Sequence, residues 1–206
     1  MAPRFTWLGH ATLRCDLPGG EVMLFDPWVE QNPACELDNE GFERLDAVLI
    51  THGHFDHMAD AVALARRYEP RIVVANFEIC TWLETQGVQN TSAMNLGGSQ
   101  DVLGHRVTMV QAIHSSGISG ESGIVPGGEA AGYVVRLDSG FTFYHSGDTA
   151  LFSDMQLIGE LYRPQLAFLP IGDHFTMDPR QAAWAARFLQ VQRVVPLHWG
   201  TFPLLT

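Results

Sequence analysis

Residues 46–60 read Asp46-Ala-Val-Leu-Ile-Thr-His-Gly-His-Phe-Asp-His-Met-Ala-Asp60, and the interpretation of the whole chain starts from this stretch. Its apolar run, 47–50, has the length and β-branched character of a buried strand. The run is followed by His52-x-His54-x-Asp56-His57, after which the pattern predicts a helix. Three imidazoles and a carboxylate within six residues form a dense cluster of metal-ligand types.

The spacing of this motif favours convergence on metal ions. Alternate residues of an extended segment point to the same side, so His52, His54 and Asp56 can converge from one loop. His57, at the predicted helix start, can then face a second ion. The alternative is a chance run of histidines, which composition alone would produce roughly once per thousand such chains. The motif therefore predicts a metal site.

Length and charge narrow the class of protein. A chain of 206 residues suits a single domain over 1–206 with a sizeable core. The formal net charge of −11 argues against nucleic acid as a partner. Bound cations would offset part of that charge locally and could attract an anionic small-molecule substrate. All 12 basic residues are arginines, which excludes catalysis through a lysine Schiff base.

The three cysteines, Cys15, Cys35 and Cys80, are odd in number and show no metal-binding or redox spacing. This favours a reducing compartment. The N-terminal residues lack the apolar core of a signal peptide, and no apolar run approaches membrane-spanning length. We therefore expect a cytoplasmic protein without a membrane partner.

Strand and helix patterns alternate along the chain. We expect strands at 4–8, 12–16, 22–25, 47–50, 72–75, within 91–113 (clearest at 106–113), 133–137, 141–145, 166–170 and 194–197. Helices are expected at 59–68, 78–86, 151–161 and from Asp178-Pro179 onward, with a short helical turn near 41–44. Residues 115–132 contain six glycines and are interpreted either as a plain hairpin connection or as a substrate-covering loop.

Potential ligands follow four of these predicted strands: the 52–57 motif, His114, Asp148 and His198. Residues so far apart in sequence can meet only if their strand ends share one edge of the fold, where sites are commonly placed. His10 lies in a predicted turn, where a lone histidine is usually just polar. His145 can equally be a buried structural histidine.

These residues resemble the metallo-β-lactamase superfamily in order and spacing: Asp26, the 52–57 motif, His114, Gly147-Asp148-Thr149 and His198. Four further segments are similar to the small bacterial metal-dependent hydrolases of that superfamily, which are related to ascorbate-6-phosphate lactonase and to the phospholipase D acting on N-acyl-phosphatidylethanolamine. The segments are Trp7-Leu-Gly-His-Ala11, Ala112-Ile-His-Ser-Ser-Gly117, Pro170-Ile-Gly-Asp-His-Phe-Thr-Met177 and Pro196-Leu-His-Trp-Gly-Thr-Phe-Pro203.

The resemblance implies a fold and a ligand set. The fold is α/β (α+β), a four-layer αβ/βα sandwich, with a two-metal site. One ion would be held by His52, His54 and His114, the other by Asp56, His57 and His198, with Asp148 bridging them. Asp26 would orient the ligand loop without binding metal. Around the metal pocket the resemblance places His10, His145, Asp173 and His174.

The expected chemistry follows from two divalent ions, with zinc or manganese the first candidates and iron or nickel further ones. Such a pair activates a shared water as hydroxide and polarises the substrate oxygen, while Asp56 would act as the catalytic proton acceptor. We expect hydrolysis of an ester, lactone or phosphodiester bond in a small substrate. A phosphodiesterase or nuclease of the same superfamily and a non-catalytic metal-binding protein remain alternatives, and a homo-oligomer is left open.

Overall fold

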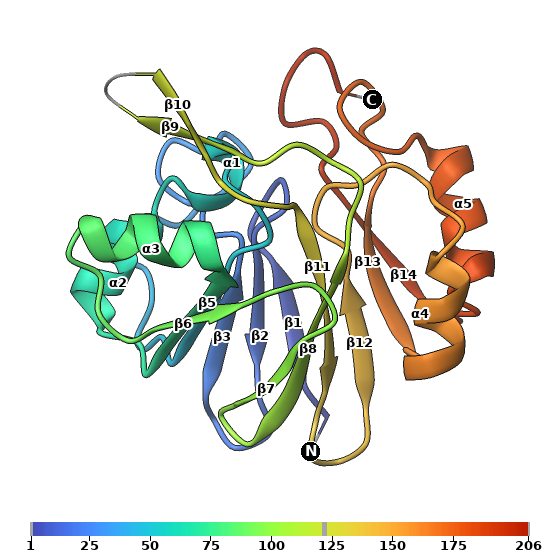
Figure 1. The fold of residues 1–206 in the computed structure, drawn as a ribbon, viewed down its shortest axis with the longest axis horizontal. Coiled ribbons are helices and arrows are strands. Elements are labelled where there is room, and N and C mark those ends of the chain that lie inside the picture. The colour runs from blue at the N-terminus through green and yellow to red at the C-terminus, as the bar shows by residue number, and fades with distance from the viewer. Residues whose placement is uncertain (1, 121–122, 206) are drawn as a thin grey trace. The chain divides into compact units, whose positions relative to one another are not determined.

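The computed structural model describes residues 2–120 and 123–205 (Figure 1). Its chain separates into two compact units. The first comprises residues up to Met94 together with Ser116–Glu129. The second comprises Asn95–Ser115 and the chain from Ala130 onward. The expectation of one metallo-hydrolase domain over the whole chain stays a prediction.

The first unit is built on a six-stranded sheet with the order β1-β2-β3-β4-β5-β6. Its strands are β1 Arg4–Trp7, β2 Leu13–Asp16, β3 Val22–Phe25, β4 Ala47–Leu49, β5 Ile72–Asn76 and β6 Thr91–Met94. The first three strands pair antiparallel through short turns, and β3 to β6 pair parallel. Parallel neighbours need crossover connections, and these contain helices between β4 and β5 and between β5 and β6, whereas residues 26–46 join β3 to β4 without a helix. Residues that leave β3, β4 and β5 therefore emerge at one edge of this sheet.

The helices of the first unit are α1 Phe55–Met58, α2 Ala61–Tyr68 and α3 Phe77–Thr85. In Figure 1 α2 and α3 lie beside the sheet, and their buried residues Leu64, Ile79 and Leu83 share a core with Val48 and Val73 of the strands. The N-terminus of α3 is capped by Asn76, whose side chain accepts a hydrogen bond from the Ile79 amide.

The second unit carries another six-stranded sheet, with the order β14-β13-β12-β11-β8-β7. Its elements are β7 Ser99–Val102, β8 His105–Gln111, β11 Ala131–Arg136, β12 Thr142–His145, α4 Met155–Tyr162, β13 Leu166–Pro170, α5 Pro179–Phe188 and β14 Val194–Leu197. The pairs β12–β13 and β13–β14 are parallel. Residues of α4 and α5 share a core with Val134, Tyr144 and Leu169 of the strands.

Residues 115–132 do not form a featureless loop. They contain a two-stranded antiparallel ribbon of β9 Gly117–Gly120 and β10 Gly123–Pro126. The ribbon belongs to the first unit.

Four sequence predictions need correction. No helical turn occurs at residues 41–44, where Phe42 is buried in the core and its amide donates to the Tyr68 hydroxyl. The helix predicted from residue 59 begins at Ala61, because the Asp60 amide donates to Pro27 and the Asp60 carboxylate accepts the amides of Val29 and Glu30.

The other two corrections fall in the second unit. The helix predicted from residue 151 begins at Met155, and Phe152 is buried in the core before the helix starts. The strand predicted to run to Ile113 ends at Gln111, because the Ile113 amide and carbonyl bond to Thr149 and Ala150 instead of to a neighbouring strand. His114 thus follows the strand by three residues.

The remaining predicted elements agree with the structure within two residues, and β13 and β14 agree at both ends. Both units combine sheet with helices, so the mixed α/β class is confirmed. Within the residues that the structure describes, every helix is too short or too polar to span a membrane.

Candidate functional site

Asp26 anchors the ligand loop of the first unit. It follows β3, is fully buried, and adopts a left-handed backbone with φ of 48°. Its Oδ1 accepts the Thr51 amide at 2.8 Å, and its Oδ2 accepts the Thr51 hydroxyl at 2.8 Å. The same Oδ2 lies 2.9 Å from Nδ1 of His57. One carboxylate therefore contacts both the residue before the 52–57 motif and the last residue of the motif.

This network determines which imidazole nitrogens carry lone pairs. Because His57 Nδ1 faces a carboxylate, it carries the proton, and Nε2 is left as the potential ligand atom. The Thr51 hydroxyl donates to Asp26, so it can only accept from His52 Nδ1, which is 3.0 Å away. His52 Nε2 is then also left with a lone pair. Both histidines are thus held in the tautomer that a metal ion requires.

The potential ligand atoms of the 52–57 motif lie close to one another. His52 Nε2 lies 3.0 Å from Nδ1 of His54, and the ring centroids of His52 and His57 are 4.1 Å apart. His57 Nε2 lies 3.9 Å from Oδ2 of Asp56. Ligand atoms of His10, Asp56 and His57 all lie within 4.8 Å of one another. This nitrogen-rich donor set with one carboxylate fits a divalent transition metal.

His10 is part of this cluster and is not an exposed turn residue. It follows β1 with φ of 54° and is fully buried. Its Nε2 lies 2.9 Å from Oδ2 of Asp56, and its ring packs edge-on against Trp28 at 5.3 Å. The backbone oxygen of His10 accepts the indole N–H of Trp7. These contacts hold the Asp56 carboxylate in one orientation.

In the second unit Asp148 lies between two histidines. Its Oδ2 is 3.0 Å from Nε2 of His198 and 3.6 Å from Nε2 of His114. The Thr149 hydroxyl accepts the Ile113 amide at 3.0 Å, which ties the residue after Asp148 to the residue before His114. The second unit by itself therefore brings these three predicted ligands together.

The approach of His198 depends on a glycine. His198 follows β14 with φ of 56°. A Cβ on Gly172 would lie 1.9 Å from the His198 carbonyl oxygen, a distance that no side chain can occupy. This contact gives Gly172, in the segment that follows β13, a definite role in placing a predicted ligand.

The three remaining predicted residues differ in position. His145 ends β12, is fully buried, and its Nδ1 accepts the Gly147 amide at 3.2 Å, which shapes the turn before Asp148. Asp173 and His174 are exposed in the turn after β13, and the His174 ring packs against Phe175. Their placement at a pocket stays a prediction.

Sequence reasoning missed two residues of the first unit that the geometry brings in. Thr51 relays the Asp26 carboxylate to His52, and its position as a polar residue directly before the ligand motif was the available signal. Trp28 is buried between His10 and Phe55, with its ring 5.6 Å from Phe55. Only its position next to Asp26-Pro27 pointed to it.

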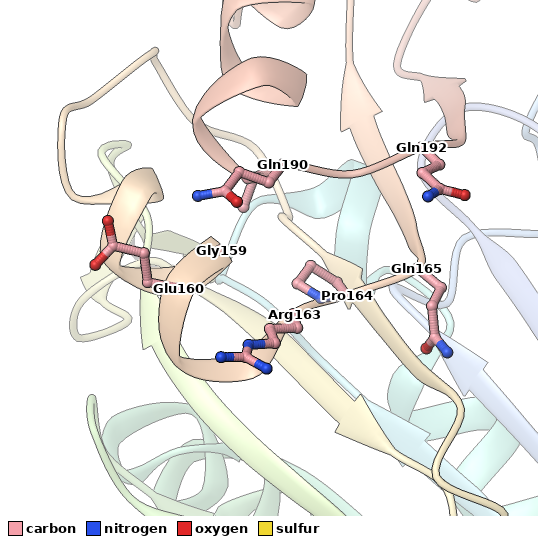
Figure 2. Close-up of a pocket in the computed structure, with 8 residues that line it drawn as sticks. Gly159, Glu160, Arg163, Pro164, Gln165, Gln190 and Gln192 are labelled. Atoms are coloured by element: carbon pink, nitrogen blue, oxygen red, sulfur yellow. The ribbon is translucent and has the colours of Figure 1, made fainter.

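The cavity in Figure 2, about 570 Å³ in volume, is separate from these clusters. It is lined by Gly159, Glu160, Arg163, Pro164, Gln165, Leu189, Gln190 and Gln192. Gln165 immediately precedes β13, so the cavity lies at the amino end of that strand. The neighbouring His145 and His198 lie at the carboxyl ends of β12 and β14, so the cavity is not part of the candidate site.

Comparison with known proteins agrees with this geometry. Residues 22–199 match the model of the beta-lactamase superfamily domain. The chain belongs to the metallo-β-lactamase superfamily. Among members of this superfamily, the chain is 53% identical over 203 residues to a UPF0173 metal-dependent hydrolase of Koribacter versatilis, covering 98% of this chain and 87% of the relative. It is also 53% identical over 205 residues to a UPF0173 metal-dependent hydrolase of Solibacter usitatus, covering 98% and 86%.

A solved structure also matches this member of the superfamily. Igni18, a metallo hydrolase from the hyperthermophilic archaeon Ignicoccus hospitalis, superimposes with a TM-score of 0.88 at 34% identity, covering 98% of this chain and 85% of that chain. The fold class and the family resemblance expected from the sequence are therefore confirmed.

Proposed function

We propose that this chain is a metal-dependent hydrolase that cleaves an ester, lactone or phosphodiester bond in a small substrate. The observation that carries the proposal is the Asp26 network, which holds His52 and His57 as metal-ligand tautomers next to Asp56. The names of the relatives, metal-dependent hydrolases, support the same class of reaction.

We propose the ligand set expected from the sequence: His52, His54, Asp56 and His57 of the first unit with His114, Asp148 and His198 of the second. In this proposal these residues would hold two divalent ions, zinc or manganese first, with Asp148 contributing to both sites. Its support is that each unit by itself brings its own members of the set together. The assignment of ligands to each ion rests on the family resemblance.

The ions would supply a water of lowered pKa and would polarise the substrate oxygen that is to carry negative charge. The side chains of the first unit would serve that chemistry. Asp56 would take the proton of the attacking water on its carboxylate and pass it to the leaving group. His10, 2.9 Å from Asp56 Oδ2, would hold this carboxylate in place while the proton moves. Asp26 would keep His57 in its ligand tautomer throughout.

A substrate panel tests the proposal. Protein loaded with zinc or with manganese is assayed on p-nitrophenyl acetate, on a γ-lactone and on bis-p-nitrophenyl phosphate. We expect turnover of at least one of them and a fall of about a hundredfold or more in kcat for Asp56→Asn, as removal of a positioned proton acceptor causes. Asp16→Asn is the control, because Asp16 ends β2 and pairs with Arg14.

The panel also separates the alternatives. Turnover of the phosphate diester alone would favour a phosphodiesterase, although the net charge of −11 disfavours a polynucleotide substrate. Bound metal with no turnover of any substrate would favour a non-catalytic metal-binding protein. A cytoplasmic location stays a prediction, and the oligomeric state stays open.

A further inference from the structure

The β9–β10 ribbon is attached to the loop that carries the predicted ligands. Gly53, between His52 and His54, donates its amide to the Ser116 hydroxyl at 3.1 Å. That hydroxyl in turn donates to the Gly127 carbonyl at 2.8 Å, on the other leg of the ribbon. A Cβ on Gly53 would lie 2.8 Å from Ile118, so only glycine allows this approach. The neck of the ribbon is therefore fixed against the ligand loop.

The second leg is held from another side. The Asn76 amide donates to the carbonyls of Gly127 at 2.6 Å and Glu129 at 2.9 Å, while its oxygen caps α3. A Cβ on Gly128 would collide with Glu78. The Gly53 amide after β4 and the Asn76 side chain at the end of β5 thus fix the neck of the ribbon within the first unit, next to α1 (Figure 1).

Beyond its neck the ribbon presents apolar side chains to solvent. Ile118 is 2% exposed and joins the core, but Val125, directly opposite on β10, is 41% exposed and Ile124 is 81% exposed. Residues 117–120 and 123–126 carry no charge. An isolated two-stranded ribbon is marginally stable in water, and exposed apolar groups on it indicate a surface that binds something.

An aromatic residue of the 52–57 motif is also apolar and exposed to solvent. Phe55 lies between His54 and Asp56, is 52% exposed, and rests against Trp28. Phe55 is thus a large, exposed apolar ring between two predicted ligands. The ribbon neck and Phe55 therefore flank the same short loop, at Gly53 and two residues beyond it.

We propose that Val125, which lies on the same face of the ribbon as Ile118, forms with Phe55 an apolar surface that binds the alkyl chain of the substrate. This inference rests on the proposed function, and it selects uncharged alkyl esters or lactones with chains of several carbons over small anionic substrates. Each methylene that leaves water should raise kcat/KM about fourfold until the surface is covered.

The test compares p-nitrophenyl acetate, butyrate, hexanoate and octanoate on the metal-loaded protein. We expect kcat/KM to rise with chain length in the parent. In the ribbon variant, Val125→Ser, the rise should largely disappear, while kcat/KM for the acetate stays within about twofold and metal content is unchanged. The matched control is Ile124→Ser, because Ile124 points to the opposite face of the ribbon, and it should keep the parent's dependence.

Binding is measured in parallel, so that failure of hydrolysis does not hide the result. Calorimetric titration with butanamide, hexanamide and octanamide should show affinity rising with chain length in the parent but not in the ribbon variant. Amide binding without ester turnover would refute the proposed function and keep the apolar surface. Equal chain-length dependence in parent and ribbon variant, or none in the parent, would overturn the inference. So would a parent dimer that the ribbon variant dissociates in sedimentation, because the surface would then bind a second copy.

Discussion

Oδ2 of Asp26 lies 2.9 Å from Nδ1 of His57, and both side chains are fully buried. The two residues are 31 positions apart in the sequence and come from the ends of different elements, β3 and α1. The carboxylate also accepts both the amide and the hydroxyl of Thr51. His52, three residues before α1, is oriented through the same hydroxyl. A single buried charge thus controls two predicted metal ligands.

Replacing that charge should weaken metal binding. We expect Asp26→Asn to lower metal affinity about 10- to 100-fold, because an outer carboxylate fixes the tautomer and orientation of the ligating histidine. Competition with a chromogenic chelator measures the affinity. Asp16→Asn, at the end of β2, should match the parent. Equal affinities in Asp26→Asn and parent would show that Asp26 does not support the site.

Gly172 should be intolerant of any side chain. In Gly172→Ala the new methyl would lie 1.9 Å from the His198 carbonyl oxygen, so the backbone must move. We expect a loss of about 1–3 kcal/mol in unfolding free energy, as overpacking causes, together with reduced metal content. Urea denaturation and elemental analysis measure the two effects. In Gly19→Ala the methyl meets only the flexible end of Glu21, so this control should lose little. Unchanged stability and metal content in Gly172→Ala would contradict the contact.

The buried end of β4 gives a pH-dependent prediction. Burial alone would raise the pKa of Asp46, but the hydrogen bonds from Arg44 and the Val22 amide and the charge of Arg44 outweigh it, so the pKa is lowered. A carboxyl whose folded pKa is depressed contributes stability above its unfolded pKa, and this contribution disappears as the pH falls through the folded value.

Replacing Arg44 should therefore lower the stability of the protein at neutral pH but not in acid. We expect Arg44→Ala to lower the free energy of unfolding at pH 7 and the difference from the parent to shrink below about pH 4. Urea titrations between pH 3 and pH 7 measure it. Arg67→Ala serves as the control, because its partner Glu40 is largely exposed and such pairs contribute little. A penalty that persists unchanged at pH 3 would refute the role of the Asp46 charge.

The cysteines should react in a fixed order. Burial raises the pKa of Cys15 to about 12 and that of Cys80 to about 11, so neither forms appreciable thiolate at pH 8. Burial also raises the pKa of Cys35, but this thiol is only half-buried. With Ellman's reagent we expect one thiol to react first in the native protein and Cys35→Ser to abolish that phase. Simultaneous reaction of all three native thiols would contradict this account.

The sequence predicted best the elements with strong local signals. Strand β13 is an apolar run after Pro164, and α5 begins at Asp178, which forms a capping box with Gln181. Local signals failed where tertiary contacts decide. Phe152 is apolar enough for a helix, but the core takes it up before α4 begins.

The site shows the same division. The 52–57 motif was readable because its ligands are adjacent in sequence. The contact between His10 and Asp56 joins residues 46 positions apart, and no local sequence pattern predicts it. The sequence left 115–132 open between a hairpin connection and a substrate-covering loop, because the place of the ribbon is set by the Gly53 amide and the Asn76 side chain and not by its own composition.

Metal stoichiometry tests the central claim most directly. Gently purified protein and an Asp148→Ala variant are analysed by elemental mass spectrometry, with Asp16→Asn as the control. The proposal predicts close to two divalent ions per chain in the parent and in the control, and a clear loss in Asp148→Ala. A parent that holds no metal, and takes up none when zinc or manganese is added, would contradict it.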